Sequence, residues 1–332
     1  MSSEQMTPRP ELPCIAFHDY DRSTVTLSLS EHKRITLCAT TADEALSNKV
    51  ICPTAQGLLL LRDPDTMATF FWNPMTGDEV VELPPLREVG DDALIDSHCL
   101  LSDHIAAPGG VVLLVEGGDD TVFWYCRLNE DDARWTKHEY DIGSHVLPYP
   151  DKDDEIEKEV ICSIAACCGT FYFDCAGKDL RTIDFSAGAE PVVTAAIAID
   201  GDMVDKRLPC QVFLVESDGE LYMVRLFFAL PYDGGDEIDG VGVYKMDFSG
   251  RRWRAVSDLG GRAFLLSPFY FGASCCAGDE YGVLPDCVYF VIHWSKTLQV
   301  FDVQQGTYQL HKLDEAPEVV NKAFWLLPTG NA

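Results

Sequence analysis

Short apolar runs recur in groups of four along most of this chain, and this repetition constrains its fold more than any other feature. Each run is rich in Val, Ile, Leu, Phe or Tyr and is ended by Gly, Pro, Asp or Asn, which is typical of strands joined by tight turns. Five such groups cover residues 49–83, 97–141, 160–198, 210–257 and 262–312. Helical periodicity is nearly absent, with one short helix candidate from Ala42 to Leu46. A period of about 40–50 residues with four strands per unit is typical of a β-propeller.

The two ends of the chain complete a sixth group. Residues 322–327 have the pattern of a first strand, and residues 13–18, 24–29 and 34–39 have the pattern of three further strands. Pairing the terminal segments makes a sixth blade and leaves no open sheet edge between the first and last blades. The sequence therefore predicts an all-β fold, a propeller of six four-stranded blades closed by pairing the N- and C-terminal strands. We expect a single domain over 13–328, a disordered tail at 1–12 and a short tail at 329–332.

Composition restricts the partners that such a propeller can have. The 332 residues are 47% hydrophobic, so the chain can bury a sizeable core. Acidic residues number 54 and basic residues 25, for a formal charge of -29. Binding to nucleic acid or to anionic membranes requires cationic side chains, so this balance predicts no nucleic-acid and no membrane partner. It favours a protein partner, and a basic one in particular.

The ends and the cysteines indicate where the protein is expected to work. The N-terminal residues lack the pattern of a secretory signal peptide, and no run of 18 apolar residues occurs. The 13 cysteines are then expected to stay reduced and to act mostly as small buried side chains. We expect a soluble monomer in the cytoplasm, the nucleus or both.

Residues that could support catalysis or metal binding are present, but their spacing favours structural roles. Cys162, Cys167, Cys168 and Cys175 lack the paired spacing of zinc ligands. Cys167-Cys168 and Cys275-Cys276 are adjacent pairs, and such pairs are poor chelators because neighbours on a strand point to opposite faces. Asp184, Asp247 and Asp302 recur at the end of a third strand. We favour the interpretation that they accept backbone hydrogen bonds in the following turns. A metal site lining the channel of a propeller hydrolase is the alternative. We expect no metal, no cofactor and no catalytic residue.

The acidic residues concentrate in loops at one expected end of the blades. The densest stretches lie within 142–159 and 229–240, and each has a tyrosine beside it. Acidic loops with aromatic anchors would suit a basic partner, although charged loops are also common as solvated surface. The candidate partner-binding residues are Tyr149, Asp151, Asp153, Asp154, Tyr232, Asp233, Asp236 and Trp294.

A specific motif order runs through the strand pattern. It starts with Gly57 before three leucines, continues through a turn of Asn-Pro-x-Thr-Gly, and reaches a strand end of Leu-Pro-Pro-Leu. Further along come a Tyr-Lys-Met-Asp run, a tryptophan and a Cys-Val-Tyr-Phe strand. The scaffold residues of this motif are Gly57, Asn73, Pro74, Thr76, Gly77, Leu83, Pro84, Pro85, Asp247, Trp253, Cys287, Tyr289 and Phe290.

This motif order resembles the plant F-box-associated β-propeller domain, formerly of unknown function and found in F-box/kelch-like kinase-suppressor proteins. The resemblance covers roughly residues 12–328. It implies a non-enzymatic propeller that acts as the substrate receptor of a ubiquitin ligase, in which the F-box binds the adaptor and the propeller binds the target. About a dozen polar residues precede the first strand, too few for a helical F-box, so the adaptor-binding half is expected to be absent. A propeller-fold metal-dependent hydrolase or small-molecule binder is the alternative.

Overall fold

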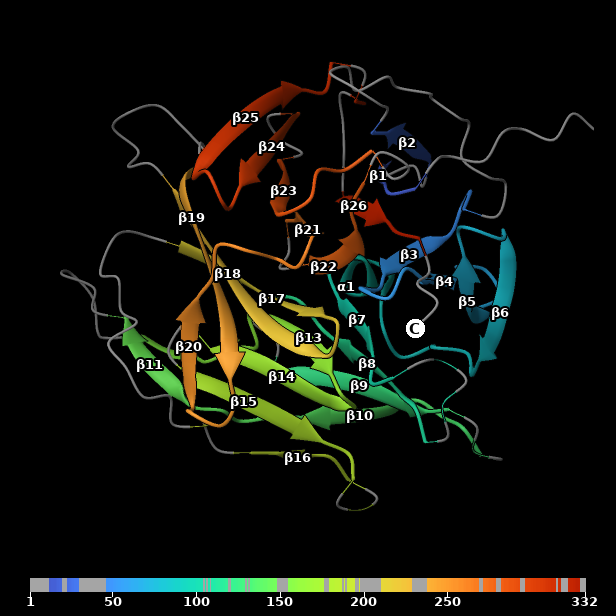
Figure 1. Cartoon of the computed structure of the whole chain (residues 1–332). Helices are drawn as coiled ribbons and strands as arrows, with labels where there is room; N and C mark the ends of the chain where they lie inside the picture. Colours follow the sequence, from blue (N-terminus) through green and yellow to red (C-terminus); the bar gives the residue numbers. More distant parts are fainter. Residues whose placement is uncertain are drawn as a thin grey trace, which may run out of the picture. The chain divides into compact units, whose positions relative to one another are not determined.

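Strands dominate the structure (Figure 1). The computed structural model describes residues 12–19, 23–29, 46–103, 105, 107, 109–118, 121–128, 130, 132–147, 155–175, 179–186, 188, 190–194, 197, 210–228, 238–268, 271–278, 282–292, 296–314, 316–317 and 322–328. Within these residues there is one short helix, α1 (Asp91–Ile95). The helix candidate at Ala42 to Leu46 lies outside them except for Leu46, which is in a turn. The chain divides into two compact units, residues 1–91 with 257–332, and residues 92–256.

The first unit contains three sheets. One has the order β2-β1-β26, with β1 (Cys14–His18), β2 (Thr24–Ser28) and β26 (Lys322–Leu326). The second runs in sequence order through β3 (Val50–Pro53), β4 (Leu59–Arg62), β5 (Thr69–Asn73) and β6 (Asp78–Leu83). The third has the order β22-β21-β23-β24-β25, with β21 (Arg262–Ser267), β22 (Phe271–Cys276), β23 (Cys287–Ile292), β24 (Thr297–Asp302) and β25 (Thr307–Lys312).

The second unit contains three four-stranded sheets and one hairpin. The first sheet consists of β7 (His98–Leu101), β8 (Val111–Val115), β9 (Val122–Arg127) and β10 (Thr136–Glu139). The next consists of β13 (Ser163–Cys167), β14 (Thr170–Cys175), β15 (Asp179–Asp184) and β16 (Val192–Val193). The last consists of β17 (Cys210–Ser217), β18 (Glu220–Phe228), β19 (Ile238–Asp247) and β20 (Arg252–Ala255). The hairpin pairs β11 (Ser144–Leu147) with β12 (Glu155–Lys158).

These six larger sheets are the blades that the sequence predicts, and the all-β, six-bladed propeller is confirmed. The sheet of β3 to β6 shows how a blade is built. Its first two strands are completely buried, whereas β6 is exposed along most of its length. In the turn between β5 and β6, the side-chain oxygen of Asn73 accepts a hydrogen bond from the backbone N–H of Met75 at 2.8 Å. Gly77, with a φ of 71°, donates its N–H to the carbonyl of Asn73 at 2.8 Å. The positive φ explains why glycine ends this turn.

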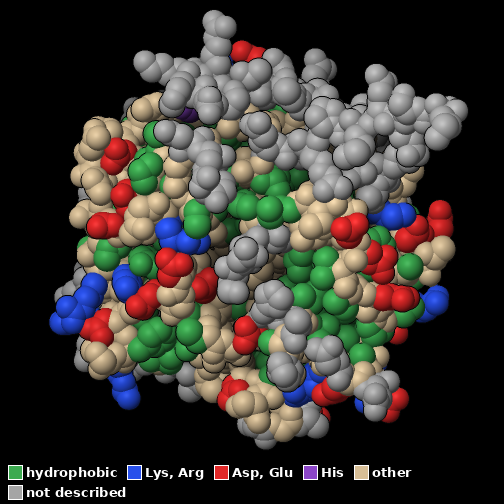
Figure 2. All heavy atoms as spheres, turned by 45° about the vertical axis from the view of Figure 1, so that its right-hand side comes forward, with side chains coloured by type: hydrophobic (Ala, Val, Ile, Leu, Met, Phe, Trp, Pro, Cys, Tyr) green, Lys and Arg blue, Asp and Glu red, His purple; other side chains and the backbone are tan. Residues whose placement is uncertain are grey.

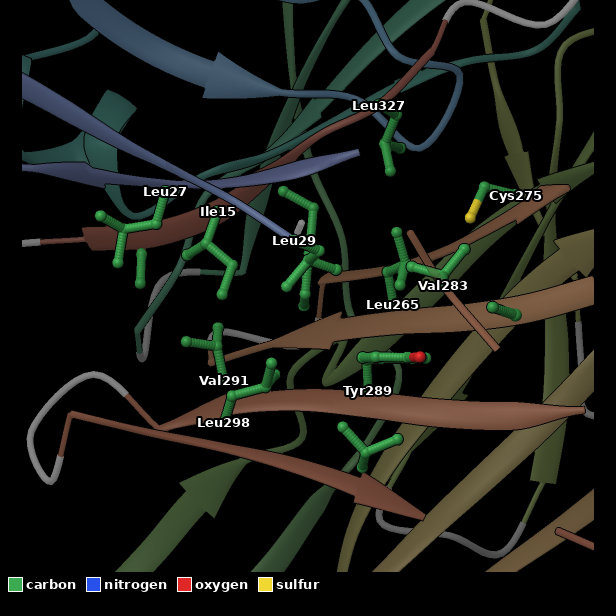
Figure 3. Packing of buried hydrophobic residues seen from close by; sticks show 14 of the residues in the cluster. Ile15, Leu27, Leu29, Leu265, Cys275, Val283, Tyr289, Val291, Leu298 and Leu327 are labelled. Atoms are coloured by element: carbon green, nitrogen blue, oxygen red, sulfur yellow. The ribbon is translucent and has the colours of Figure 1, made fainter. Parts of the chain in front are cut away.

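The pairing of the two chain ends is confirmed in the sheet β2-β1-β26. β26 runs antiparallel to β1, with Ile15 opposite Trp325. The fourth strand expected at residues 34–39 lies outside the described residues. Apolar side chains from β1, β26 and the sheet of β21 to β25 form one packed cluster (Figure 3). Within it the indole N–H of Trp325 donates to the carbonyl of Leu266 at 2.8 Å, and its ring meets Tyr289 edge-on at 6.3 Å.

The sheet of residues 262–312 differs from the expected four-stranded blade. β22 lies between the first two strands expected in this group, residues 262–267 and 287–292, and it pairs antiparallel with β21 as an additional edge strand. β21 and β23 run parallel, with Ala263 opposite Cys287. Residues of β22 such as Gly272, Ala273 and Ser274 have low strand propensity, and the strand forms because β21 has a backbone edge to pair with. The C-terminal ends of β21 and β23 therefore lie at the same edge of the sheet. The sequence-based assignment of connecting loops to one end or the other of the blades is therefore wrong for this blade.

The second unit is held by apolar side chains that extend from one blade to the next. One cluster joins Ala165 and Leu180 of the β13–β16 sheet to Val212, Met246 and Trp253 of the β17–β20 sheet. Trp253 stands opposite Met246 on the neighbouring strand and keeps 9% of its surface exposed. The motif tryptophan therefore packs between two blades.

Replacing Trp253 with alanine is expected to lower the free energy of unfolding by about 3 kcal/mol, because the change leaves a cavity between the two sheets. Denaturant unfolding of the variant measures this loss. The neighbouring Arg252 is exposed, so Arg252→Ala should change stability by less than about 0.5 kcal/mol. Equal effects of the two substitutions would contradict the packing of Trp253 in the core.

Candidate interaction surface

The acidic connection between β10 and β13 contains a two-stranded ribbon that the sequence pattern does not reveal. The stretch 142–159, expected to be a loop, contains β11 and β12, which pair antiparallel with Ser144 opposite Lys158 and Leu147 opposite Glu155 (β11 is green in Figure 1). Acidic residues and lysine have low strand propensity, so residue propensities do not predict a strand at β12. The signal that could have identified it is the alternation of Glu155, Ile156 and Glu157.

The base of this hairpin is anchored in the core of the second unit. Ile142 and Ile161, on either side of it, are buried in the cluster formed with β8, β9 and β14. The carbonyl of Ile142 accepts a hydrogen bond from the guanidinium of Arg181 at 2.6 Å, and the same guanidinium pairs with the carboxylate of Glu159 at 3.6 Å. The N–H of Glu159 donates to the carbonyl of Gly143 at 2.9 Å. Core packing and one partly buried cation therefore hold the hairpin at its base.

The two sides of the ribbon differ in chemistry. His145 lies opposite Glu157, and their side chains are 3.1 Å apart. Val146 lies opposite Ile156, and directly paired residues project from the same side of a ribbon. Val146 keeps 56% of its surface exposed and Ile156 keeps 71%. The hairpin thus presents an exposed aliphatic pair within an acidic stretch.

Exposed apolar side chains also occur elsewhere, so exposure by itself does not identify a binding surface. Met75 and Val80 beside or on β6, and Tyr308 and Leu310 on β25, are each between 40% and 48% exposed. Figure 2 shows apolar side chains reaching one face of the molecule between acidic and basic ones. Scattered exposed hydrophobic residues are normal on protein surfaces. Among the described residues, Val146 and Ile156 stand out because they are the most exposed large hydrophobic side chains and face each other across a ribbon.

The candidate partner-binding residues from the sequence lie outside the described residues. This holds for Tyr149, Asp151, Asp153, Asp154, Tyr232, Asp233, Asp236 and Trp294. The first four belong to the segment that connects β11 to β12 in the sequence. The structure places at the hairpin five residues that no sequence motif marks: Val146, Ile156, His145, Glu157 and Arg181.

Several motif residues are buried on strands or directly follow one. Leu83 is buried at the end of β6, and Pro84 and Pro85 follow it. Cys287, Tyr289 and Phe290 are buried on β23. Burial raises the pKa of the Cys287 thiol to about 12 and holds the pKa of the Tyr289 hydroxyl above its usual range. The Tyr289 hydroxyl accepts a hydrogen bond from the N–H of Leu284 at 2.8 Å. These groups stay neutral and support the fold.

The three recurring aspartates close turns. In each turn, the aspartate carboxylate accepts a hydrogen bond from the backbone N–H of a residue two or three positions further on. Asp184 accepts from Ser186 at 2.7 Å, Asp247 from Gly250 at 2.9 Å and Asp302 from Gln305 at 2.8 Å. The hydroxyl of Ser249 and the N–H of Gly250 hold the pKa of Asp247 well below its usual range. The turn interpretation is therefore confirmed, and these carboxylates are already engaged with their own loops.

Among the residues that the structure describes, no group of three or more His, Cys, Asp or Glu side chains is arranged to hold a metal ion. No helix in that part of the chain has the length and apolar character needed to cross a bilayer.

Comparison with known proteins adds the family. No curated protein sequence matches the chain. Solved structures with a similar chain path include the nidogen/laminin complex, with 10% identity, coverage of 95% of this chain and 99% of the other, and a TM-score of 0.45. Another is the Cps50 (Swd1) propeller domain of Myceliophteria thermophila, with 10% identity, coverage of 93% and 88%, and a TM-score of 0.37.

The chain also matches a known sequence family. The match extends from residue 26 to residue 313 and so includes the turn motif of β5–β6, Trp253 and β23. Because this match spans most of the sequence, the chain belongs to the KIB1-4 β-propeller family.

Proposed function

We propose that this chain is a non-enzymatic protein-interaction propeller, and that the hairpin β11–β12 is where a basic segment of a partner protein docks. The observation that carries this proposal is the aliphatic pair Val146 and Ile156, which the hairpin holds exposed in an acidic stretch. A non-polar centre surrounded by charge is the usual anatomy of a protein interface.

The physical chemistry of the hairpin supports a partner of this type. A two-stranded ribbon is marginally stable in water, and its outer edges carry backbone groups that an added strand can pair with. The sequence from 151 to 159 carries six acidic residues and two lysines. Electrostatic complementarity of this kind speeds the encounter with a basic segment and excludes acidic ones. Covering Val146 and Ile156 would then supply affinity.

The resemblance to F-box-associated propellers supports a finer proposal. We infer that the partner is a target protein and that this chain serves as a substrate receptor related to those of ubiquitin ligases, acting as a monomer in the cytoplasm or nucleus. The strongest candidate residues for metal-dependent hydrolysis, Asp184, Asp247 and Asp302, close their own turns. This use of the carboxylates favours an interaction role over the hydrolase alternative.

The test replaces the aliphatic pair and follows partners recovered from native tissue. Val146→Ser with Ile156→Ser should lower the recovery of a specific partner by about tenfold or more, because burying each side chain contributes roughly 1.5–3 kcal/mol. The matched control is Val80→Ser, which changes an exposed valine on β6. Unfolding free energies should stay within about 0.5 kcal/mol of the original chain for both variants.

A photo-crosslinking residue at position 156 identifies what touches the hairpin. A basic protein that crosslinks there and is lost with the double variant supports the proposal. If every specific partner binds the double variant as well as it binds the control, the hairpin is not the docking site. If the partners that depend on the hairpin are acidic, the charge argument is wrong. Recovery of a ligase adaptor together with the target would support the receptor role.

A further inference from the structure

Two turns from adjacent blades meet around a pair of thiols in the second unit. β13 and β14 are joined by Cys168 and Gly169, whose φ values are 50° and 79°. β17 and β18 are joined in the same way by Asp218 and Gly219, with φ values of 52° and 75°. Two central residues with positive φ are the requirement of the type I′ hairpin turn. The sulfur atoms of Cys167 and Cys168 each lie 3.5 Å from the carbonyl oxygen of Gly219.

The turn brings two neighbouring sulfur atoms together, which a strand does not do. The Sγ atoms of Cys167 and Cys168 are 4.0 Å apart. Cys168 is exposed to solvent, and Cys167 is buried. The second adjacent pair, Cys275 and Cys276, lies on β22, where successive side chains point to opposite faces. The chain thus contains two Cys-Cys sequences, and the fold directs the thiols of one pair toward each other.

We propose that Cys167 and Cys168 form a modification site that hydrogen peroxide converts to an intramolecular disulfide. The exposed Cys168 reacts first: its thiolate attacks one peroxide oxygen, an S–O bond forms, the O–O bond breaks, and the departing hydroxide takes a proton to become water. The sulfur of Cys167 then attacks the sulfenic acid. The S–S bond forms, the S–O bond breaks, and the hydroxyl leaves as water with the proton of Cys167. Two thiols and one peroxide give one disulfide and two waters.

The two residues have the exposure that these two steps need. Oxidant-sensing cysteines are accessible to solvent and have a resolving cysteine beside them. Burial raises the pKa of the Cys167 thiol to about 12, so Cys167 keeps its proton until it reacts with the sulfenic acid. Closure requires the exposed Cys168 side chain to move from 4.0 Å to bonding distance.

Covalent geometry makes the product reversible. Consecutive Cα atoms are about 3.8 Å apart across a trans peptide, which is shorter than the span of about 4.4–6.8 Å usual for disulfides. A strained disulfide is reduced more easily than a relaxed one. The closed form also loses the S–H groups that face the carbonyl of Gly219, so oxidation would loosen the contact between the two turns.

The experiment oxidises the reduced full-length chain with hydrogen peroxide under native conditions. The remaining thiols are then blocked with N-ethylmaleimide in denaturant, and the peptides are analysed by mass spectrometry. The peptide with Cys167 and Cys168 is expected to lose two hydrogen atoms (about 2 Da) and to take no maleimide at these residues. Dithiothreitol should restore both labels. Cys168→Ser should abolish the loss, whereas Cys162→Ser should leave it unchanged.

The pair on β22 is the internal control. Cys275 and Cys276 should take two maleimides after the same treatment, and both pairs should oxidise alike when the chain is unfolded before the peroxide is added. Two outcomes would overturn the proposal: a Cys167–Cys168 peptide that keeps both thiols, or one in which Cys168 ends as a sulfinic acid or bonds to another cysteine. Equal oxidation of the two pairs in the folded chain would overturn the geometric argument.

Discussion

Replacing Trp325 with alanine is expected to lower the free energy of unfolding by about 4–5 kcal/mol, near the upper end for loss of a buried aromatic ring. Trp325 is 1% exposed and lies on β26, the C-terminal strand that pairs with β1. The loss of the ring opens a cavity against Tyr289 and leaves the carbonyl of Leu266 without the indole donor. Denaturant unfolding, followed by a probe other than Trp325 fluorescence, measures the effect.

The variant Trp325→Phe separates packing from hydrogen bonding. Phenylalanine keeps most of the ring volume and removes the N–H. The free energy of unfolding should therefore fall by about 1–3 kcal/mol, because a buried acceptor is left unsatisfied. If alanine and phenylalanine cost the same, the hydrogen bond to Leu266 dominates and the packing argument is wrong. If alanine costs less than about 1 kcal/mol, Trp325 does not hold the closing sheet to its neighbour.

Replacing Arg62 with methionine is expected to cost about 3–5 kcal/mol, because removing the buried guanidinium leaves two backbone carbonyls and a partly buried carboxylate without their donor. Arg62 ends β4 and is 1% exposed. Its guanidinium donates to the carbonyls of Leu86 at 2.9 Å and Val89 at 2.6 Å, and it pairs with the carboxylate of Asp91. These contacts hold the segment that follows β6, so hydrogen exchange of residues 84–91 should rise in the variant.

Lys49 provides the matched control on the same blade. It also pairs with an aspartate, Asp63, at 2.6 Å, but its side chain keeps 22% of its surface exposed. Lys49→Met should therefore cost no more than about 1 kcal/mol, as is usual for ion pairs in contact with water. Comparable losses for the two variants would show that burial does not set the role of Arg62.

The repeat of strands and turns could be predicted from the sequence because its determinants are local. A turn such as Asn73 to Gly77 needs a side-chain acceptor at its start and a glycine that tolerates positive φ, and both are visible as residue types. Runs of β-branched and aromatic residues likewise predict strands such as β8 and β23. The aspartates of the turns follow the same local rule, and their structural role was correctly favoured.

Long-range pairing could not be predicted in this way. β22 consists mostly of small residues and β12 mostly of charged ones, and each becomes a strand because a neighbouring strand pairs with its backbone. The parallel pairing of β21 with β23 has no local signature either. The pairing of Val146 with Ile156 follows from the register of β11 with β12. A prediction that treats residues 142–159 as a charged loop cannot identify this pair.

The fold class, the number of blades and the pairing of the two ends can be inferred from the sequence alone, because they follow from the period of apolar runs and from turn chemistry. Which side chains meet depends on the tertiary fold. Cys167 and Cys168 are neighbours in the chain, yet the turn at Cys168 and the adjacent carbonyl of Gly219 are what bring their sulfur atoms together. The physical reason is that residue types set local backbone preference, whereas distances between side chains depend on register and on packing against other strands.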